Sequence, residues 1–310
     1  MNEVPVLGSY ILDRIGNTPL IVFRRLLPHN SRVRIFAKAE WFNPGGSVKD
    51  RAALQIILDA ERRGDLTPGK VLIDSSSGNT GIAYAMIGAA RGIPIELVMP
   101  ASVSEERKLI AAAFGAKVIY SDPYEGSDGA IRLVREIVAA QPERYYYADQ
   151  YSNPSNWLAH YRTTGPEIWR QTMGQVTHIV AGLGTSGTIM GAGRYLQGRN
   201  AKVRVIGVQP DDALHGIEGL KHMESAIVPA IYDERRLNAK LLVSTEEAFD
   251  MARRIAREEG IFTGQSAGAA FAAALRLADS LDEGTIVVIF PDSGDKYLTT
   301  SLWQKQDWSI

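Results

Sequence analysis

The stretch Asn43-Pro-Gly-Gly-Ser-Val-Lys49-Asp-Arg51 places a lysine directly after a glycine-rich turn. Ser47 is a residue type that caps helices, and helical spacing continues to Ala60, so Lys49 is predicted near a helix start. A helix start disfavours a second positive charge, so a lysine there loses its proton more readily. A neutral amine is what Schiff-base chemistry requires. Alone, the stretch is equally typical of a solvated lysine, and two further glycine-rich turns decide between these interpretations.

Strand and helix patterns alternate along most of the chain, which predicts an α/β fold with parallel sheets covered on both faces. Strands are expected at 33–38, 70–74, 94–99, 116–120, 145–148, 178–181, 203–208 and 285–290. Helices are expected from Lys49, at 82–90, from Ser104, from about Gly126, from Thr185 and on both sides of 264–268. The stretch 151–156 is the predicted domain crossing, and 211–233 is predicted to be a loop over the site.

Composition excludes several classes of function. The chain has 310 residues, a net charge of -1 and no basic tail, so it offers no case for nucleic acid or a membrane surface as partner. It has no cysteine, and its five histidines lack paired metal-ligand spacing, so no disulfide, cysteine nucleophile or metal site is predicted. Without a signal peptide or an apolar run of about 18 residues, a cytoplasmic location is the simplest expectation.

The turn Gly182-Leu-Gly184-Thr-Ser-Gly187 follows a predicted strand and opens a predicted helix. It matches the dinucleotide fingerprint, but that interpretation needs an acidic residue at the end of the next strand, where Gln209 stands. A smaller prediction remains: backbone N–H groups with the Thr185, Ser186 and Thr188 hydroxyls form a phosphate cradle. The alternative is a tight turn that binds nothing.

Two other turns have the same character. Ser75–Gly81 allows close approach to the backbone, and its Asn79 and Thr80 offer side-chain hydrogen bonds. Gly264–Gly268 also precedes a helix. Each alone is typical of a capped helix start. Together with one lysine and a phosphate cradle, they indicate a pyridoxal phosphate enzyme.

These residues resemble the fold-type II (tryptophan synthase β-like) pyridoxal phosphate enzymes, and within them the cysteine synthases, especially the B-type. The resemblance covers nearly the whole chain, and its motifs are 15–20, 43–51, 77–81, 149–154, 160–168, 184–188, 264–268 and 292–297. It implies two three-layer αβα domains with mainly parallel sheets. Residues 46–153 would form the smaller, mobile substrate-binding domain, and 1–45 plus 154–310 the larger domain that binds the cofactor phosphate. A homodimer is implied as well.

The resemblance also implies roles for single residues. Lys49 would carry the internal aldimine and act as the base at the substrate Cα, Asn79 would bind the cofactor ring oxygen, and Ser266 would face the pyridine nitrogen. The phosphate would be held by Gly184, Thr185, Ser186, Gly187 and Thr188. The substrate carboxylate would be held by Ser76, Ser77, Thr80 and Gln150, with the backbone around Gly78. Threonine is commoner than serine at position 76, but both carry a hydroxyl. Lys221, in the loop over the site, is either a cation for a phosphate leaving group or a solvated lysine.

The implied reaction is a β-replacement that makes L-cysteine from O-acetyl-L-serine or O-phospho-L-serine and sulfide or another sulfur donor. It would pass through an aminoacrylate with ping-pong kinetics. The leaving group and the sulfur donor stay open. The first alternative is cystathionine β-synthase, which uses serine and homocysteine. The second, from a different class, is a non-catalytic amino-acid or nucleotide binding protein, which need not keep Lys49.

Overall fold

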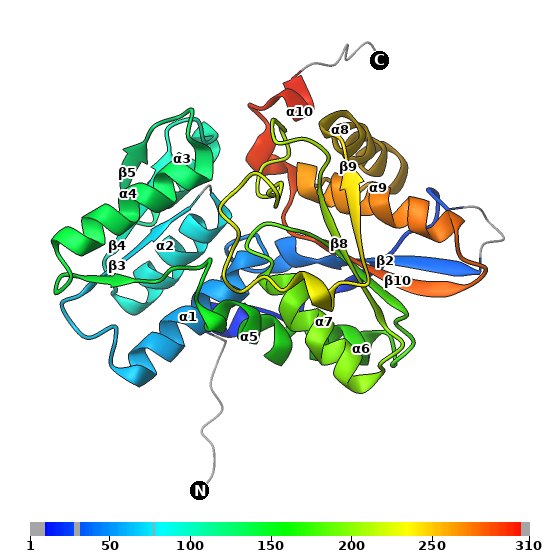
Figure 1. Ribbon diagram of the computed structural model, residues 1–310, viewed down its shortest axis with the longest axis horizontal. Helices are drawn as coiled ribbons and strands as arrows, with labels where there is room; N and C mark the ends of the chain where they lie inside the picture. Colours follow the sequence, from blue (N-terminus) through cyan, green and yellow to red (C-terminus); the bar gives the residue numbers. More distant parts are fainter. Residues whose placement is uncertain (1–9, 28–31, 77, 305–310) are drawn as a thin grey trace, which may run out of the picture.

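The computed structural model describes residues 10–27, 32–76 and 78–304, and contains two sheets with helices on both faces (Figure 1). The larger sheet has the order β1 (Leu20–Val22), β2 (Val33–Ala39), β10 (Gly284–Phe290), β7 (His178–Gly182), β8 (Arg204–Pro210) and β9 (Ala239–Val243). Only the β1–β2 pair is antiparallel in this sheet. The smaller sheet, β5 (Lys117–Ser121), β4 (Ile95–Pro100), β3 (Val71–Ser75) and β6 (Tyr145–Tyr147), is entirely parallel. The prediction of αβα layers with mainly parallel sheets is confirmed.

The predicted helices lie close to their expected positions, whereas the helices within 154–171 and at 301–304 were not predicted. The α-helices are α1 (Lys49–Arg63), α2 (Asn79–Arg91), α3 (Glu105–Ala113), α4 (Gly126–Ala140), α5 (Pro154–Arg162), α6 (Thr164–Gln171), α7 (Gly187–Arg199), α8 (Thr245–Arg254), α9 (Gln265–Asp279) and α10 (Ser301–Gln304). The shorter helical segments are η1 (Ile11–Arg14), η2 (Glu40–Phe42), η3 (Glu234–Arg236) and η5 (Gly294–Tyr297), and the π-helical turn η4 (Ile255–Glu259) extends α8.

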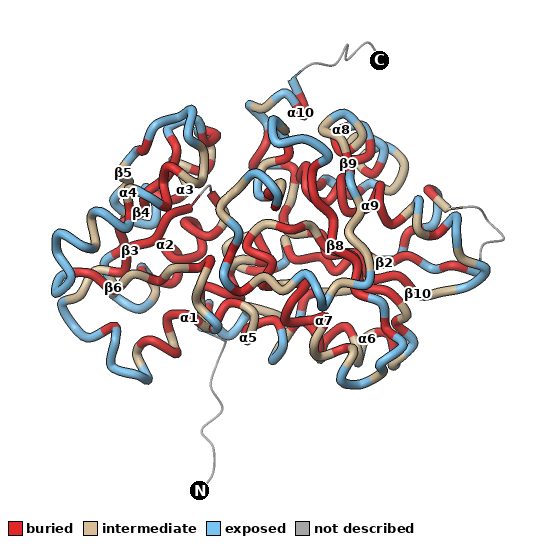
Figure 2. Tube along the Cα trace, viewed as in Figure 1, coloured by how far each residue is buried: buried red, intermediate tan, exposed pale blue. Residues whose placement is uncertain are grey.

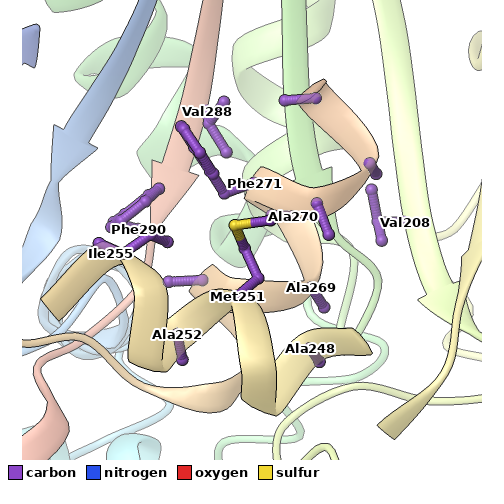
Figure 3. Close-up of a cluster of buried hydrophobic side chains, with 14 of the residues drawn as sticks. Val208, Ala248, Met251, Ala252, Ile255, Ala269, Ala270, Phe271, Val288 and Phe290 are labelled. Carbon is purple, nitrogen blue, oxygen red and sulfur yellow. The ribbon is translucent and has the colours of Figure 1, made fainter. Parts of the chain in front are cut away.

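Alternate residues of the larger sheet belong to two different cores, because successive strand residues point to opposite faces. Val180 and Val288 pack beneath α8 and α9, where small residues of α9 and Met251 of α8 fill the space (Figure 3). Their neighbours Ile179 and Val287 pack against α7 on the other face. The inner strands are therefore buried from both sides, which explains their unbroken apolar runs (Figure 2).

The smaller sheet follows the same rule. Leu72 and Leu97 pack toward α1, α2 and α3, whereas Ile73 and Val98 pack toward α4. A single core per face thus fixes the starts of α1 and α2 beside the carboxyl ends of the strands. The segment 211–233 contains no helix or strand, as predicted.

A cluster of buried charges joins the start of α1 to the larger sheet. Arg51 donates to both carboxylate oxygens of Glu40, at 2.7 and 2.9 Å, and to both of Glu167, at 2.7 and 2.8 Å. Lys38, on β2, donates to Glu167 at 2.6 Å. All four side chains are nearly inaccessible to solvent. These pairs hold α1 in position two residues after Lys49.

Within the described ranges, no helix is long and apolar enough to cross a membrane. Across those same residues, no group of three or more His, Asp or Glu side chains is placed to hold a metal ion.

Candidate active site

A cavity of about 660 Å³ lies at the carboxyl ends of strands from both sheets. Its wall includes residues at the end of β4 and after β6, β7 and β10, together with the segment 213–226. Ligands in parallel α/β folds bind at this end of the strands, where helix N-termini and loops converge. The predicted loop over the site, 211–233, therefore does contribute to the cavity wall.

Lys49 is the first residue of α1 and lines the cavity. Val48 occupies the N-cap position without a capping side chain, and Ser47 Oγ instead accepts the Lys49 backbone N–H at 3.3 Å. Burial lowers the pKa of the Lys49 amine, Asp292 opposes this effect, and the positive charges of Arg107 and Lys296 add to it. Lys49 is thus held in an environment that favours its neutral, nucleophilic form.

The turn between β7 and α7 contains the residues predicted to form a phosphate cradle, and it lines the cavity. A side chain at Gly184 would put its Cβ 2.2 Å from the Gly219 carbonyl oxygen, and one at Gly187 would meet Asn156 Oδ1 at 2.0 Å. Ser186 is the N-cap of α7 with a left-handed φ of 68°, which is why this helix begins two residues later than predicted. Such strain in a non-glycine residue is typical of functional turns.

One hydroxyl of this turn, that of Ser186, has no hydrogen-bond partner among the described residues. Ser186 Oγ is buried, and no hydrogen bond to it is found in the described part of the chain. Thr185 accepts from Asn156 Nδ2 at 3.2 Å, and the Thr188 hydroxyl lies 3.3 Å from His160 Nε2. An orphaned hydroxyl at the N-terminus of a 13-residue helix fits a phosphate group, which supplies both the missing partner and the negative charge that the helix dipole favours.

Asn79 and Ser266 lie at the starts of α2 and α9 and also line the cavity. Asn79 Nδ2 donates to Asp292 Oδ2 at 2.6 Å. Ser266 is buried in the first turn of α9, so the stretch 264–268 is mostly helix rather than the turn that was predicted to precede it. Their neutral polar side chains are available to a bound aromatic cofactor, but their individual roles stay predictions.

The predicted carboxylate loop divides into two parts. Thr80 and Gln150 line the cavity and are joined by a hydrogen bond of 2.8 Å from Thr80 Oγ1 to Gln150 Oε1. Ser76 Oγ instead accepts the backbone N–H groups of Gly78 and Gly81, at 3.1 and 2.8 Å, so it orders the start of α2. Gly78 has a φ of 145°, which favours glycine. Ser77 lies outside the described residues.

A buried carboxyl group, Asp74, lies beneath this loop and accepts the backbone N–H groups of Ser75 and Gln150, at 2.8 and 3.2 Å. Burial and the neighbouring Asp149 raise the pKa of Asp74 to about 8. The folded protein therefore keeps a proton here that the unfolded chain releases near its ordinary value of 3.8. Stability linked to this proton is present at low pH and declines as pH rises toward about 8.

We expect Asp74→Asn to remove this slope. Over the window from about pH 4 to about pH 8, one proton changes the unfolding free energy by up to about 1.4 kcal/mol per pH unit. Urea unfolding of the wild type and the variant across this window measures the difference. Parallel curves of unfolding free energy against pH would contradict the prediction.

Lys221 is buried in the cavity wall, and its Nζ lies 2.6 Å from Asp128 Oδ1 on α4. It is therefore not a solvated loop lysine. Asp128 also accepts the backbone N–H of Ile227 at 2.8 Å. The pair links the smaller sheet's helix to the loop over the cavity.

Sequence reasoning assigned no role to four residues around Lys49. Arg107, on α3, forms an ion pair with Glu218 in the loop and lies over the ring of Tyr297, 4.7 Å from its centroid. Asp292 and Lys296 both contact Asn79. For Asp292, Lys296 and Tyr297 the sequence did hold a signal, since the motif 292–297 was part of the resemblance. Nothing in the sequence distinguished the fourth residue, Arg107, from other arginines on helices.

Comparisons with known proteins agree with this site. The family model described as pyridoxal-phosphate dependent enzyme matches residues 11–292. A cysteine synthase of Aquifex aeolicus is 56% identical over 303 residues, covering 96% of this chain and 93% of the relative. Cysteine synthase B of Pseudomonas aeruginosa is 44% identical over 293 residues, covering 94% and 97%.

A solved structure shares the fold of this chain. The crystal structure of O-acetyl serine sulfhydrylase isoform 3 from Entamoeba histolytica superimposes with a TM-score of 0.90 at 38% identity, covering 99% of this chain and 94% of that one. The resemblance to the cysteine synthases, the B form included, and the prediction of pyridoxal phosphate as cofactor are confirmed. The chain belongs to the family of pyridoxal-phosphate dependent enzymes.

Proposed function

We propose that this protein makes L-cysteine from O-acetyl-L-serine and sulfide, using pyridoxal phosphate. The observation that carries the proposal is Lys49, a lysine of lowered pKa that shares one cavity with the glycine cradle of 184–188. The relatives named cysteine synthase and O-acetyl serine sulfhydrylase match nearly the whole chain.

The cofactor, when bound, supplies the electron sink that lets an amino acid lose a Cα proton and a β leaving group. The residues of the chain would bind the cofactor and orient it. The cradle of 184–188 holds the phosphate, and Ser266 offers a neutral hydroxyl to the ring nitrogen. A neutral hydroxyl would stabilise the protonated form of that nitrogen less than a carboxylate would, which favours prompt loss of the leaving group over transamination.

Lys49 Nζ moves the proton. Burial lowers the pKa of this amine, which favours the neutral form that would accept the substrate's Cα proton and return it after the sulfur has added. Thr80, Gln150 and the backbone around Gly78 hold the substrate carboxylate, with Ser76 and Ser77 as further predicted contacts. The hydrogen bond between Thr80 and Gln150 keeps both side chains oriented toward the cavity.

Ion pairs across the cavity mouth exclude water. Arg107 on α3 pairs with Glu218, and Asp128 on α4 pairs with Lys221, so the smaller sheet's helices are tied to the loop at two points. Separation of both pairs would widen the cavity for substrate, and their re-formation would help to seal the reaction from solvent.

The pairing of Lys221 favours a substrate that carries an uncharged acetyl ester over one that carries a phosphate ester. Its ammonium is already paired with Asp128, so a phosphate would have to displace that carboxylate. We therefore propose O-acetyl-L-serine ahead of O-phospho-L-serine, and Lys221 as a residue that closes the loop rather than one that binds phosphate.

We further propose residues 46–153 as the smaller, mobile substrate-binding domain and 1–45 with 154–310 as the larger one. In support, the four-stranded sheet lies within the first range and the six-stranded sheet draws on both parts of the second. We also propose a homodimer, by resemblance, and a cytoplasmic location, which the absence of cysteine fits. Light scattering of the purified protein tests the dimer.

The test of function is cysteine formation by the purified, cofactor-loaded protein. We expect O-acetylserine with sulfide to give cysteine, and O-phosphoserine with sulfide to give at least about tenfold less, because Lys221 is paired. A faster reaction with O-phosphoserine would reverse the assignment of the leaving group. Product formed only from serine and homocysteine would replace the proposed function by cystathionine synthesis.

A further inference from the structure

A second buried lysine, Lys296, lies behind the cavity wall. It belongs to η5 and is 4% exposed. Its Nζ donates to three oxygens: the Gly45 carbonyl at 3.2 Å, the Gly46 carbonyl at 3.0 Å and Asn79 Oδ1 at 3.0 Å. One side chain from the end of the chain thus holds two segments of the predicted cofactor site.

The hydrogen bond from Lys296 to Asn79 fixes the orientation of the Asn79 amide. An ammonium group only donates hydrogen bonds, so the Asn79 atom that faces Lys296 must be the oxygen. The Nδ2 group therefore lies on the other side, where it donates to Asp292 Oδ2 at 2.6 Å. An amide nitrogen carries two hydrogens, which leaves one for a ligand in the cavity that Asn79 lines.

The second set of contacts holds the turn that leads into Lys49. Gly46 has a φ of 74°, and a Cβ there would lie 3.2 Å from Lys296 Nζ. Lys296 therefore packs directly on this turn and accounts for two of its carbonyl groups. The position of Lys49, three residues further on, depends on the same turn.

The charges around Asn79 are balanced between Lys296 and Asp292. The Asp292 carboxylate also accepts the Tyr297 hydroxyl at 2.8 Å. Burial lowers the pKa of Lys296, and Asp292 and Asp50 oppose that effect while Arg107 adds to it. Loss of the lysine would leave the Asp292 carboxylate facing Asn79 with one positive neighbour fewer, Lys49 and Arg107 remaining.

We propose that Lys296 is a positioning residue of the cofactor site, which turns the Asn79 N–H toward the ring oxygen of bound pyridoxal phosphate and favours the ionised form of that oxygen. The inference deepens the proposed function and rests on its cofactor site. Lys296 acts through Asn79 and through its charge, and it performs no step of the reaction itself.

The experiment compares Lys296→Met, Lys296→Gln and Lys296→Arg with the wild type. The absorption spectrum of the cofactor-loaded proteins is recorded at one fixed pH near neutrality, and the dissociation constant for pyridoxal phosphate is measured by titrating the apo-proteins. The ring oxygen is ionised in the yellow, long-wavelength form of the bound cofactor and protonated in the short-wavelength form. We expect K296M to shift intensity to the short-wavelength band and to bind the cofactor about tenfold more weakly.

The other variants separate position from charge. K296R keeps a charged donor and is expected to retain most of the yellow band, whereas K296Q keeps a donor without charge and is expected to lose it. K296Q also gives the result if K296M does not fold. Asn79→Ala is expected to shift the spectrum in the same direction as K296M does, and the double variant by less than the sum of the two shifts, because Lys296 acts in part through Asn79.

Lys38 provides the matched control. It is another buried lysine with three hydrogen bonds, to Thr18 O, Glu167 and Gln171, but it lies in the ion cluster beside α1. K38M is expected to lower the melting temperature and leave the spectrum unchanged. A wild-type spectrum and affinity in K296M and K296Q, or an equal shift in K38M, would overturn the inference. A wild-type protein that binds the cofactor but makes no cysteine would overturn the proposed function alone, and the spectra would still decide on Lys296.

Discussion

Replacement of Lys49 by alanine is expected to lower the rate of cysteine formation by at least about 10⁴-fold. Two losses would combine, because in the proposed mechanism the amine is both the covalent anchor of the cofactor and the carrier of the Cα proton, and a positioned proton carrier alone contributes about 10²–10⁴-fold. Burial lowers the pKa of Lys49, which favours the neutral amine that both tasks require. Initial rates with O-acetylserine and sulfide measure the loss.

Borohydride reduction followed by peptide mass spectrometry identifies the lysine that carries the cofactor. We expect the added mass on the peptide that contains Lys49. Lys117 is the matched control, since its side chain is 64% exposed on β5, and K117A is expected to keep wild-type activity. Cofactor bound covalently to Lys296, the other buried lysine beside Asn79, would contradict the assignment.

The parts of this site that could be predicted from sequence are those with local signals. Lys49, the cradle 184–188 and Ser266 all stand at helix starts, next to glycines that a close approach demands. Gly184 and Gly187 show why, since a Cβ at either position would collide with a neighbouring segment. The continuous apolar runs of the inner strands likewise result from burial on both faces, so the sequence pattern predicts that burial directly.

What could not be predicted depends on contacts between distant segments. Lys296 meets Asn79 across 217 residues of chain, and Arg107 meets Glu218 across 111. The local sequence around Lys296 or Arg107 does not indicate which distant residue it contacts. The strands β1 and β9 were missed for another reason: both lie at edges of the larger sheet and are only partly buried. β1 has only three residues, and Lys240 interrupts the apolar residues of β9.

Replacement of Arg51 by methionine is expected to lower the free energy of unfolding by about 3–5 kcal/mol. The side chain satisfies both oxygens of Glu40 and of Glu167, and its removal leaves two carboxylates facing each other with only Lys38 to balance them. Urea unfolding at neutral pH measures the change. Arg62, 66% exposed and paired with Asp59, is the control, and R62A is expected to cost less than about 1 kcal/mol.

The pH dependence of unfolding separates the charge effect from lost packing. Hydrogen bonds and charges of Arg51 and Lys38 outweigh burial and lower the pKa of Glu167 to about 2. A depressed carboxyl pKa contributes stability that is present above its ordinary value of 4.5 and is lost as pH falls toward about 2. The wild type should therefore lose stability on acidification through this range, and R51M should lose less, because Glu167 without Arg51 has a higher pKa.

If R51M loses stability only through its smaller volume, its unfolding free energy will instead run parallel to that of the wild type from pH 5 to pH 2. Parallel curves would show that the cluster holds α1 by packing, and equal stability of the two proteins at neutral pH would refute the expected cost of the unpaired carboxylates.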